Sequence, residues 1–489
     1  MSEPLVTTEQ AENDLLACAV LVAETIETQE GYTEAMSVLA LRYAAKGEVE
    51  QAATIADTID DPFTRDKTYL EIAVRAYSNG NRDLAFDLIE SMNDYSFKAL
   101  AEGQIAVIAA DNGEFEEALE IANKMDDSSA TLADIALRIF DSGDVTTAKE
   151  LIAKIEFASS RAFAYNEISS RHLKAERKEE SVNALMVSLS SVEKIEFEEE
   201  KAVAFIETAN RFVEVEKIDK AKGLLEKAKT ISIGMDDGDS RDSILVTLSL
   251  THARLQEFDT AGEFLDEIAD PMQAVSCLVG IAKEHKQAGD KESCLSFLDE
   301  AYEIATGADL FLARSVYRRN ALLATIAFRY AECDEFEKAV TAIKAVDADL
   351  ERRGALSGLT VFYIQNNQEE NAAKTVDEID DDYSRALCLT RMSETDGVHL
   401  EEAEKLAQTI QHKYQKTIAL AEIAERYNLK EEKETADKLL TEAVELIPHI
   451  NDKYEKVLAL SHLSVKYDRA EKDLDDSAKK VLREIVVAL

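Results

Sequence analysis

The chain has 489 residues, of which only 4 are proline and 16 are glycine, and it contains no tryptophan. Few helix breakers together with 46% hydrophobic residues indicate a mostly helical chain with enough apolar material for a continuous core. The 98 acidic residues outnumber the 55 basic ones and give a net charge of −43, which disfavours binding to nucleic acid or to anionic membrane surfaces. Two interpretations of this charge stay open: a solvated surface that keeps the protein in solution, or a surface that attracts a basic partner or mimics nucleic acid.

The chain begins with a segment that lacks the basic residues of a signal peptide. The apolar stretch Leu15–Val22 is too short to span a membrane and is soon followed by Glu24, so it predicts an N-terminal capping helix within residues 1–30. The cysteines are odd in number and show no paired spacing, which predicts neither a disulfide framework nor a zinc site and favours a cytoplasmic location. They are Cys18, Cys277, Cys294, Cys333 and Cys388.

Residues 34–61 predict the first pair of antiparallel helices. Met36, Leu39 and Tyr43 recur at helical spacing, and Gly47 then ends that helix because glycine tolerates the left-handed backbone of a helix end. Glu48 starts a second helix, which carries Ala52 on its inner face. A small residue is expected there because two helices approach closely only where neither has a bulky side chain.

This small residue recurs along the chain at intervals of 30 to 45 residues. A period of this size indicates stacked helix pairs, that is, an all-α solenoid with about twelve repeats between residues 31 and 455. The intervals lengthen near residues 181–261 and 294–339, where longer helices are expected, and residues 456–489 predict C-terminal capping helices. The recurring positions are Ala52, Ala85, Ala118, Ala148, Ser181, Ala221, Ala261, Cys294, Ala339, Ala372, Ala403 and Ala436.

The repeat resembles the tetratricopeptide repeat family over roughly residues 35–454. The matching features are a small residue in the first helix, such as Ala40 or Ala327, an aromatic three residues later, such as Tyr43 or Tyr330, a turn glycine, and a second small residue five positions on. Most units are one residue short, the terminal proline is mostly absent, and the usual tryptophan is missing. The resemblance implies a right-handed α-solenoid that binds ligands on the face lined by its first helices.

By register, the resemblance places a partner-binding face at a set of mostly apolar first-helix positions. Either these side chains are buried by tight winding, or they form a groove for an extended segment or an amphipathic helix. An exposed apolar row of this length would need a partner. The predicted positions are Leu41, Val74, Tyr77, Val107, Leu137, Phe140, Phe328, Val361 and Ile364.

An arginine recurs beside the predicted helix crossing in seven units, and Lys466 occupies an equivalent place. Two interpretations stay open for this arginine ladder: ion pairs with acidic residues of adjacent units, which would set the stacking register, or a cationic row that holds an acidic peptide. Its members are Arg42, Arg75, Arg138, Arg171, Arg211, Arg329 and Arg426.

The sequence contains no motif for catalysis, for a cofactor or for a metal ion. Aspartate-rich turns such as Asp60–Asp61 lack the spacing of a calcium loop, so they predict caps for the helices that follow. His172, His252 and His285 fall where other units carry the aromatic, which predicts packing residues.

These observations predict a non-catalytic scaffold or adaptor that binds a protein or peptide. The acidic charge of the chain would favour a basic partner. The alternative is an acidic regulatory subunit that controls a separate effector enzyme by covering a basic surface. Homo-oligomerisation stays open.

Overall fold

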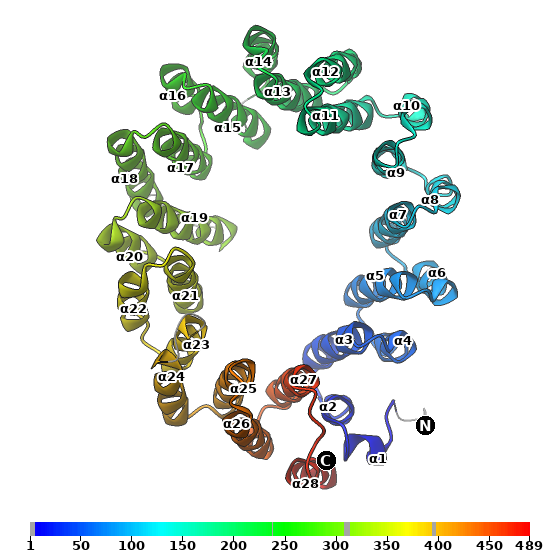
Figure 1. Ribbon diagram of the computed structural model, residues 1–489, viewed down its shortest axis with the longest axis vertical. Coiled ribbons are helices and arrows are strands. Elements are labelled where there is room, and N and C mark those ends of the chain that lie inside the picture. The colour runs from blue at the N-terminus through cyan, green and yellow to red at the C-terminus, as the bar shows by residue number, and fades with distance from the viewer. Residues whose placement is uncertain (1–4, 237, 308–312, 394–397) are drawn as a thin grey trace. The chain divides into compact units, whose positions relative to one another are not determined.

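The computed structural model describes residues 5–236, 238–307, 313–393 and 398–489, and among these residues the regular elements are all helical (Figure 1). Long first helices alternate with second helices, and partners pack together as α3 does with α4 and α11 with α12. The first helices are α3 (Gln29–Ala45), α5 (Pro62–Ser78), α7 (Tyr95–Asp111), α9 (Ser129–Asp141), α11 (Ala158–Lys174), α13 (Glu198–Glu214), α15 (Asp239–Arg254), α17 (Pro271–Gln287), α19 (Ala313–Glu332), α21 (Asp349–Gln365), α23 (Asp382–Met392), α25 (Lys413–Leu429) and α27 (Lys453–Arg469).

The second helices vary in length, from 8 residues in α4 to 17 in α18, and the longest are α12, α14 and α18. They are α4 (Val49–Ala56), α6 (Arg82–Ser91), α8 (Phe115–Ala122), α10 (Val145–Lys154), α12 (Lys178–Val192), α14 (Ile218–Ile233), α16 (Phe258–Asp266), α18 (Lys291–Gly307), α20 (Phe336–Lys344), α22 (Glu369–Asp377), α24 (Val398–Thr409) and α26 (Lys433–Leu446). Outside these pairs lie α1 (Thr8–Ala11), α2 (Leu15–Ala23), the short 3₁₀ helix Ile447–His449, and α28 (Asp476–Ala488).

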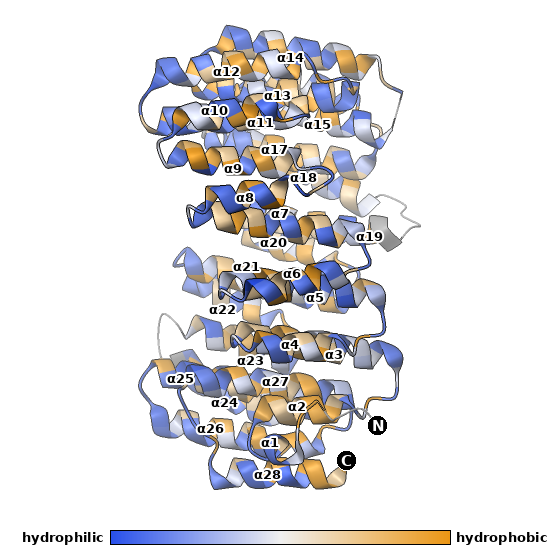
Figure 2. Ribbon diagram, turned by 90° about the vertical axis from the view of Figure 1, so that its right-hand side faces the viewer, coloured by the Kyte–Doolittle hydropathy of each residue, from blue (hydrophilic) through white to orange (hydrophobic). Residues whose placement is uncertain are grey.

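The chain divides into two compact units. Unit 1 is made of both chain ends, residues 1–105 and 360–489, and unit 2 is the intervening segment 106–359. The chain therefore leaves unit 1 within α7 and returns to it within α21. In both units apolar and polar residues alternate along the helices, as expected of helices that bury one face (Figure 2).

The recurring small residues lie where the sequence places them, inside the helix pairs. All twelve are at most 2% exposed, so each of these positions is enclosed by the neighbouring helices. Where the residue is Ser181, its hydroxyl lies 2.7 Å from that of Ser169, the small residue of the paired first helix, so both buried hydroxyls are hydrogen-bonded.

The aspartate-rich turns act as helix caps, as predicted. The Asp61 carboxylate accepts a hydrogen bond of 2.8 Å from the Thr64 amide at the start of α5, and Asp381 does the same for Ser384 at the start of α23. A side chain that accepts from the third residue of a helix satisfies one of the amide groups left without an intrahelical partner. Pro62, which follows Asp61, is the first residue of α5, a position where proline costs no hydrogen bond.

Candidate functional site

The predicted partner-binding positions divide into two groups. Tyr77, Leu137 and Phe140 are at most 7% exposed. The Tyr77 ring meets Phe86 of α6 edge to face at 6.2 Å, and the Phe140 ring meets His172 of α11 at 5.4 Å. These three side chains therefore fill the interior between helices in this structure and present little surface to a partner.

The other six positions are partly open. Leu41, Val74, Val107, Phe328, Val361 and Ile364 are all half-buried. Phe328 of α19 lies over Gly358 of α21, where a Cβ atom would come within 3.1 Å of its ring. The glycine makes room for the phenylalanine to cover the next first helix. The first helices of both units thus carry half-buried apolar side chains at a repeated register.

The arginine ladder makes ion pairs between successive first helices in unit 2. Arg138 of α9 lies 2.9 Å from Asp111 of α7, and Arg171 of α11 lies 2.8 Å from Asp141 of α9. Arg211 of α13 lies 2.9 Å from a carboxylate of α11. In each case the arginine pairs with a carboxylate of the preceding first helix. These contacts agree with the interpretation that the ladder consists of ion pairs between adjacent units.

The remaining ladder arginines differ in their surroundings. Arg329 pairs at 2.7 Å with Glu332 of its own helix, Arg75 is exposed, and Arg42 and Arg426 are half-buried. Arg138 and Arg171 together line a cavity of about 500 Å³ in unit 2. Its other lining residues are Ala110, Asp111, Gly113, Phe115, Asp141 and Ser142. The two cations in this cavity are matched by two carboxylates, so it carries no excess positive charge.

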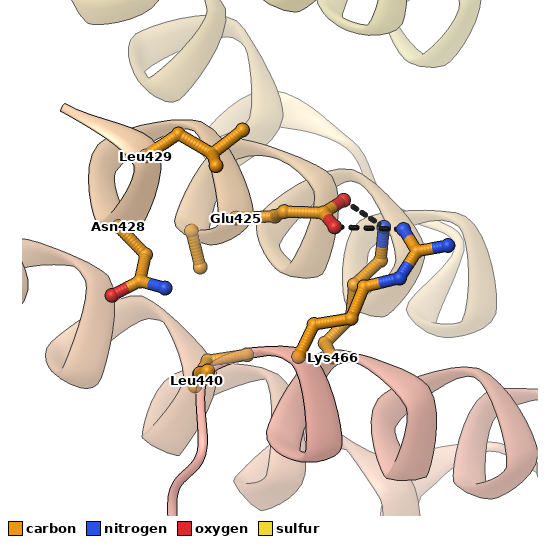
Figure 3. A pocket seen from close by; sticks show the side chains of 8 residues that line it. Glu425, Asn428, Leu429, Leu440 and Lys466 are labelled. Atoms are coloured by element: carbon orange, nitrogen blue, oxygen red, sulfur yellow. Dashed lines mark hydrogen bonds and ion pairs between the residues drawn. The ribbon is translucent and has the colours of Figure 1, made fainter. Parts of the chain in front are cut away.

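Unit 1 contains the most enclosed charge network of the ladder. The Lys466 amine on α27 is 4% exposed and lies 2.7 Å from Glu422 and 2.5 Å from Glu425 of α25. Arg469 also contacts Glu425, at 2.7 Å. Figure 3 shows Lys466 reaching across to Glu425. Both residues line a small cavity of about 210 Å³. The residues that line this cavity include Ala424 and Leu440.

The carboxylates of this network stay ionised to low pH. Burial alone would raise the pKa of Glu422, but His462, 3.0 Å away, and Lys466 outweigh it and bring that pKa down to about 2. The pKa of Glu425 is lowered in the same way, with burial again opposing the contacts of Lys466 and Arg469. The network is therefore a fixed set of opposite charges that joins α25 to α27.

The histidines at aromatic positions are packing residues, as predicted. His285 stacks between Phe258 at 3.7 Å and Phe297 at 5.2 Å, and it is 7% exposed. His172 and His252 are similarly buried. Within the described residues, no group of three or more histidine, cysteine, aspartate or glutamate side chains is placed to hold a metal ion.

One close pair was not anticipated from the sequence. The sulfur atoms of Cys294 and Cys333 lie 3.4 Å apart, and both residues are buried. Burial, and then the neighbouring thiol, raise the pKa of Cys294, which disfavours its thiolate form. A spacing of 39 residues gives no motif that would reveal such a pair, because it arises from the stacking of two repeats.

Comparison with known proteins adds little beyond the fold. No protein-family model and no curated sequence matches the chain. Among solved structures, it is similar to the apo form of the quorum sensor NprR from B. thuringiensis, at 12% identity and a TM-score of 0.26 over 65% of this chain and 97% of the other. It is also similar to the Rap protein complexed with Competence and Sporulation Factor, at 13% identity and a TM-score of 0.26 over 78% of this chain and 99% of the other. A third similar structure is the APC/C hetero-tetramer Cut9-Hcn1, at 12% identity and a TM-score of 0.23 over 92% of this chain and 95% of the other.

Likenesses with TM-scores this low carry no argument about function. The fold itself is an all-helical repeat of antiparallel helix pairs, each with a buried small residue at its recurring position. In the described part of the chain no helix is both long and apolar enough to cross a membrane.

Proposed function

We propose that the chain is a non-catalytic scaffold that holds a protein or peptide partner on the face formed by its first helices. The observation that carries this proposal is the repetition of half-buried apolar side chains at one register, as at Leu41, Val74 and Val361 of unit 1. Apolar side chains that are partly open can gain further burial from a partner, whereas the enclosed Tyr77, Leu137 and Phe140 cannot.

Ion pairs already occupy several ladder arginines, so we assign the ladder to stacking rather than to gripping an acidic peptide. Arg138, Arg171 and Arg211 each contact carboxylates on two sides. A partner carboxylate would have to displace these contacts. The apolar row is therefore the better candidate for the source of affinity.

Affinity purification from the native host, quantified by mass spectrometry, tests this proposal. We expect Leu41→Asp combined with Val74→Asp to lower recovery of the partner by at least about tenfold, because a carboxylate at an apolar contact is desolvated without a counter-charge. Leu429→Asp is the matched control, since Leu429 is 66% exposed and lies outside this register. Equal recovery with the face variant and the control, both showing native circular dichroism, would reject the proposed face.

The charge supports a second candidate function, control of a separate effector enzyme by covering its basic surface. A net charge of −43 would attract such a surface over a long range in low salt. This candidate predicts that recovery falls steeply between low and moderate salt and is insensitive to the Leu41 and Val74 substitutions. The apolar face predicts the opposite pattern.

A further inference from the structure

The helix nearest the N-terminus is packed against the last long helix of the chain. All residues of α2 except Leu21 are buried, and α2 packs chiefly on α27 within unit 1 (Figure 1). The Lys453 amine of α27 donates a hydrogen bond of 2.6 Å to the backbone carbonyl of Thr25, which follows α2. These two residues are 428 positions apart in the chain.

In sequence register, α2 takes the place of a second helix, and among the described residues only the four-residue α1 precedes it. Ala19 precedes Ala52 by 33 residues, the commonest interval of the repeat, and it is fully buried like the other recurring small residues. The 9 residues of α2 also match the 8 of α4 and the 10 of α6. Helix α2 thus has the length and the small residue needed to pair with a first helix. Of the two first helices that it contacts, α27 and α3, it packs more extensively on α27.

The helix that follows α27 in the chain lacks these properties. The recurring small residue lies five positions after the left-handed turn residue, as Ala52 does after Gly47. Glu471 is the left-handed turn residue after α27, so the corresponding position is Asp476, whose carboxylate cannot be buried at a helix crossing without a partner. Helix α28 instead packs on α26, α1 and α2.

Helix α27 is also a neighbour of α3. Lys46 at the end of α3 lies 3.4 Å from Asp468 of α27, so an ion pair joins these first helices as in the arginine ladder. Leu41 and Val465 each lie six residues before a left-handed turn residue, and both are half-buried. The register of the proposed binding face therefore continues from α3 to α27.

We propose that α27 and α2 form one composite helix pair that clasps the two chain ends together, and that the partner-binding face runs across this clasp with Val465 beside Leu41. The evidence for the clasp is the set of contacts between α2, α3 and α27 given above. Only the role of the clasp in partner binding rests on the proposed function. A helix from the N-terminus thereby completes the last repeat, and neither chain end is stable without the other.

Hydrogen exchange by mass spectrometry on the full chain tests the clasp without any partner. In Ala19→Trp we expect overpacking to speed exchange in α27 by at least about tenfold. The matched control is Ala118→Trp, at the same register of α8 in unit 2, which should speed exchange around α8 and leave α27 as in the wild type. Unchanged exchange of α27 in Ala19→Trp would overturn the proposal.

A second measurement needs no variant. In the wild-type protein, exchange of α2 and α27 measured in rising denaturant should follow one common opening reaction, because each helix loses its partner when the other detaches. Opening of α2 at clearly lower denaturant than α27 would also overturn the clasp. If the clasp is found but a Val465→Asp variant recovers partner as the wild type does, the extension of the binding face is wrong while the clasp stands.

Discussion

At the residue scale, a left-handed residue recurs in the turn that follows a first helix. It has a positive φ after twelve of the first helices within the described residues. The next residue then donates its N–H back into the first helix, as Lys217 does to the Phe212 carbonyl at 2.8 Å. Glycine fills five of these positions, but Glu176, Glu216, Gln256, Glu431 and Glu471 fill five others.

Non-glycine residues at these turns store conformational strain that glycine would relieve. We expect Gln256→Gly to raise the free energy of unfolding by about 0.5–1 kcal/mol, because relief of the left-handed strain exceeds the added chain entropy of glycine. Gly80→Ala is the reciprocal control and should lower it by about 1 kcal/mol, since φ is +86° and no atom lies within 4 Å of the added Cβ. Urea unfolding measures both, and changes of the opposite sign would contradict this account.

At the element scale, ion pairs join successive first helices, as Arg138 does for α9 and α7. The Lys466 network is the most enclosed case, and its removal leaves Glu422 and Glu425 without their shared counter-charge. We expect Lys466→Met to lower the free energy of unfolding by about 1–3 kcal/mol at pH 7. The matched control is Lys405→Met, because the Lys405 side chain is 80% exposed and an exposed ion pair contributes little.

The same network predicts a pH dependence. The pKa of Glu422 is about 2 in the folded protein and near 4.5 when unfolded, so its contribution is complete above pH 4.5 and is lost as the pH falls toward 2. Urea midpoints measured across this window should fall less in Lys466→Met than in the wild type. A parallel fall in both proteins would show that Lys466 does not hold the pKa of Glu422 down.

At the scale of the whole molecule, the sequence predicts the repeated helix pairs but not the packing of α2 on α27. The buried small residues, the aspartate caps and the packing histidines follow from helical periodicity and from side-chain chemistry within one repeat. The partnership of α2 with α27 does not, since periodicity describes neighbours along the chain and carries no signal about helices hundreds of residues apart. The sequence hints at this partnership in only two places. Ala19 falls at the spacing of the recurring small residues, and Asp476 stands where the next small residue would be expected.

The candidate site shows the same limit. Register places Leu41 and Tyr77 on first helices, but it does not distinguish a half-open position from an enclosed one. That difference depends on the ring of Tyr77 meeting Phe86 of the paired helix, a contact between two repeat elements. The turn residues Glu176 and Gln256 were missed because glutamate and glutamine carry no preference that marks a left-handed conformation.

Zero-length carbodiimide cross-linking of the full-length monomer tests most directly whether the chain ends complete each other. This reagent joins an amine to a carboxylate only when they touch, and Lys46 and Asp468 lie 3.4 Å apart. We predict a cross-linked peptide pair containing these two residues in the monomer fraction, with Lys466–Glu425 as the positive control inside one chain end. Recovery of the control link without any Lys46–Asp468 link in the monomer would contradict the account.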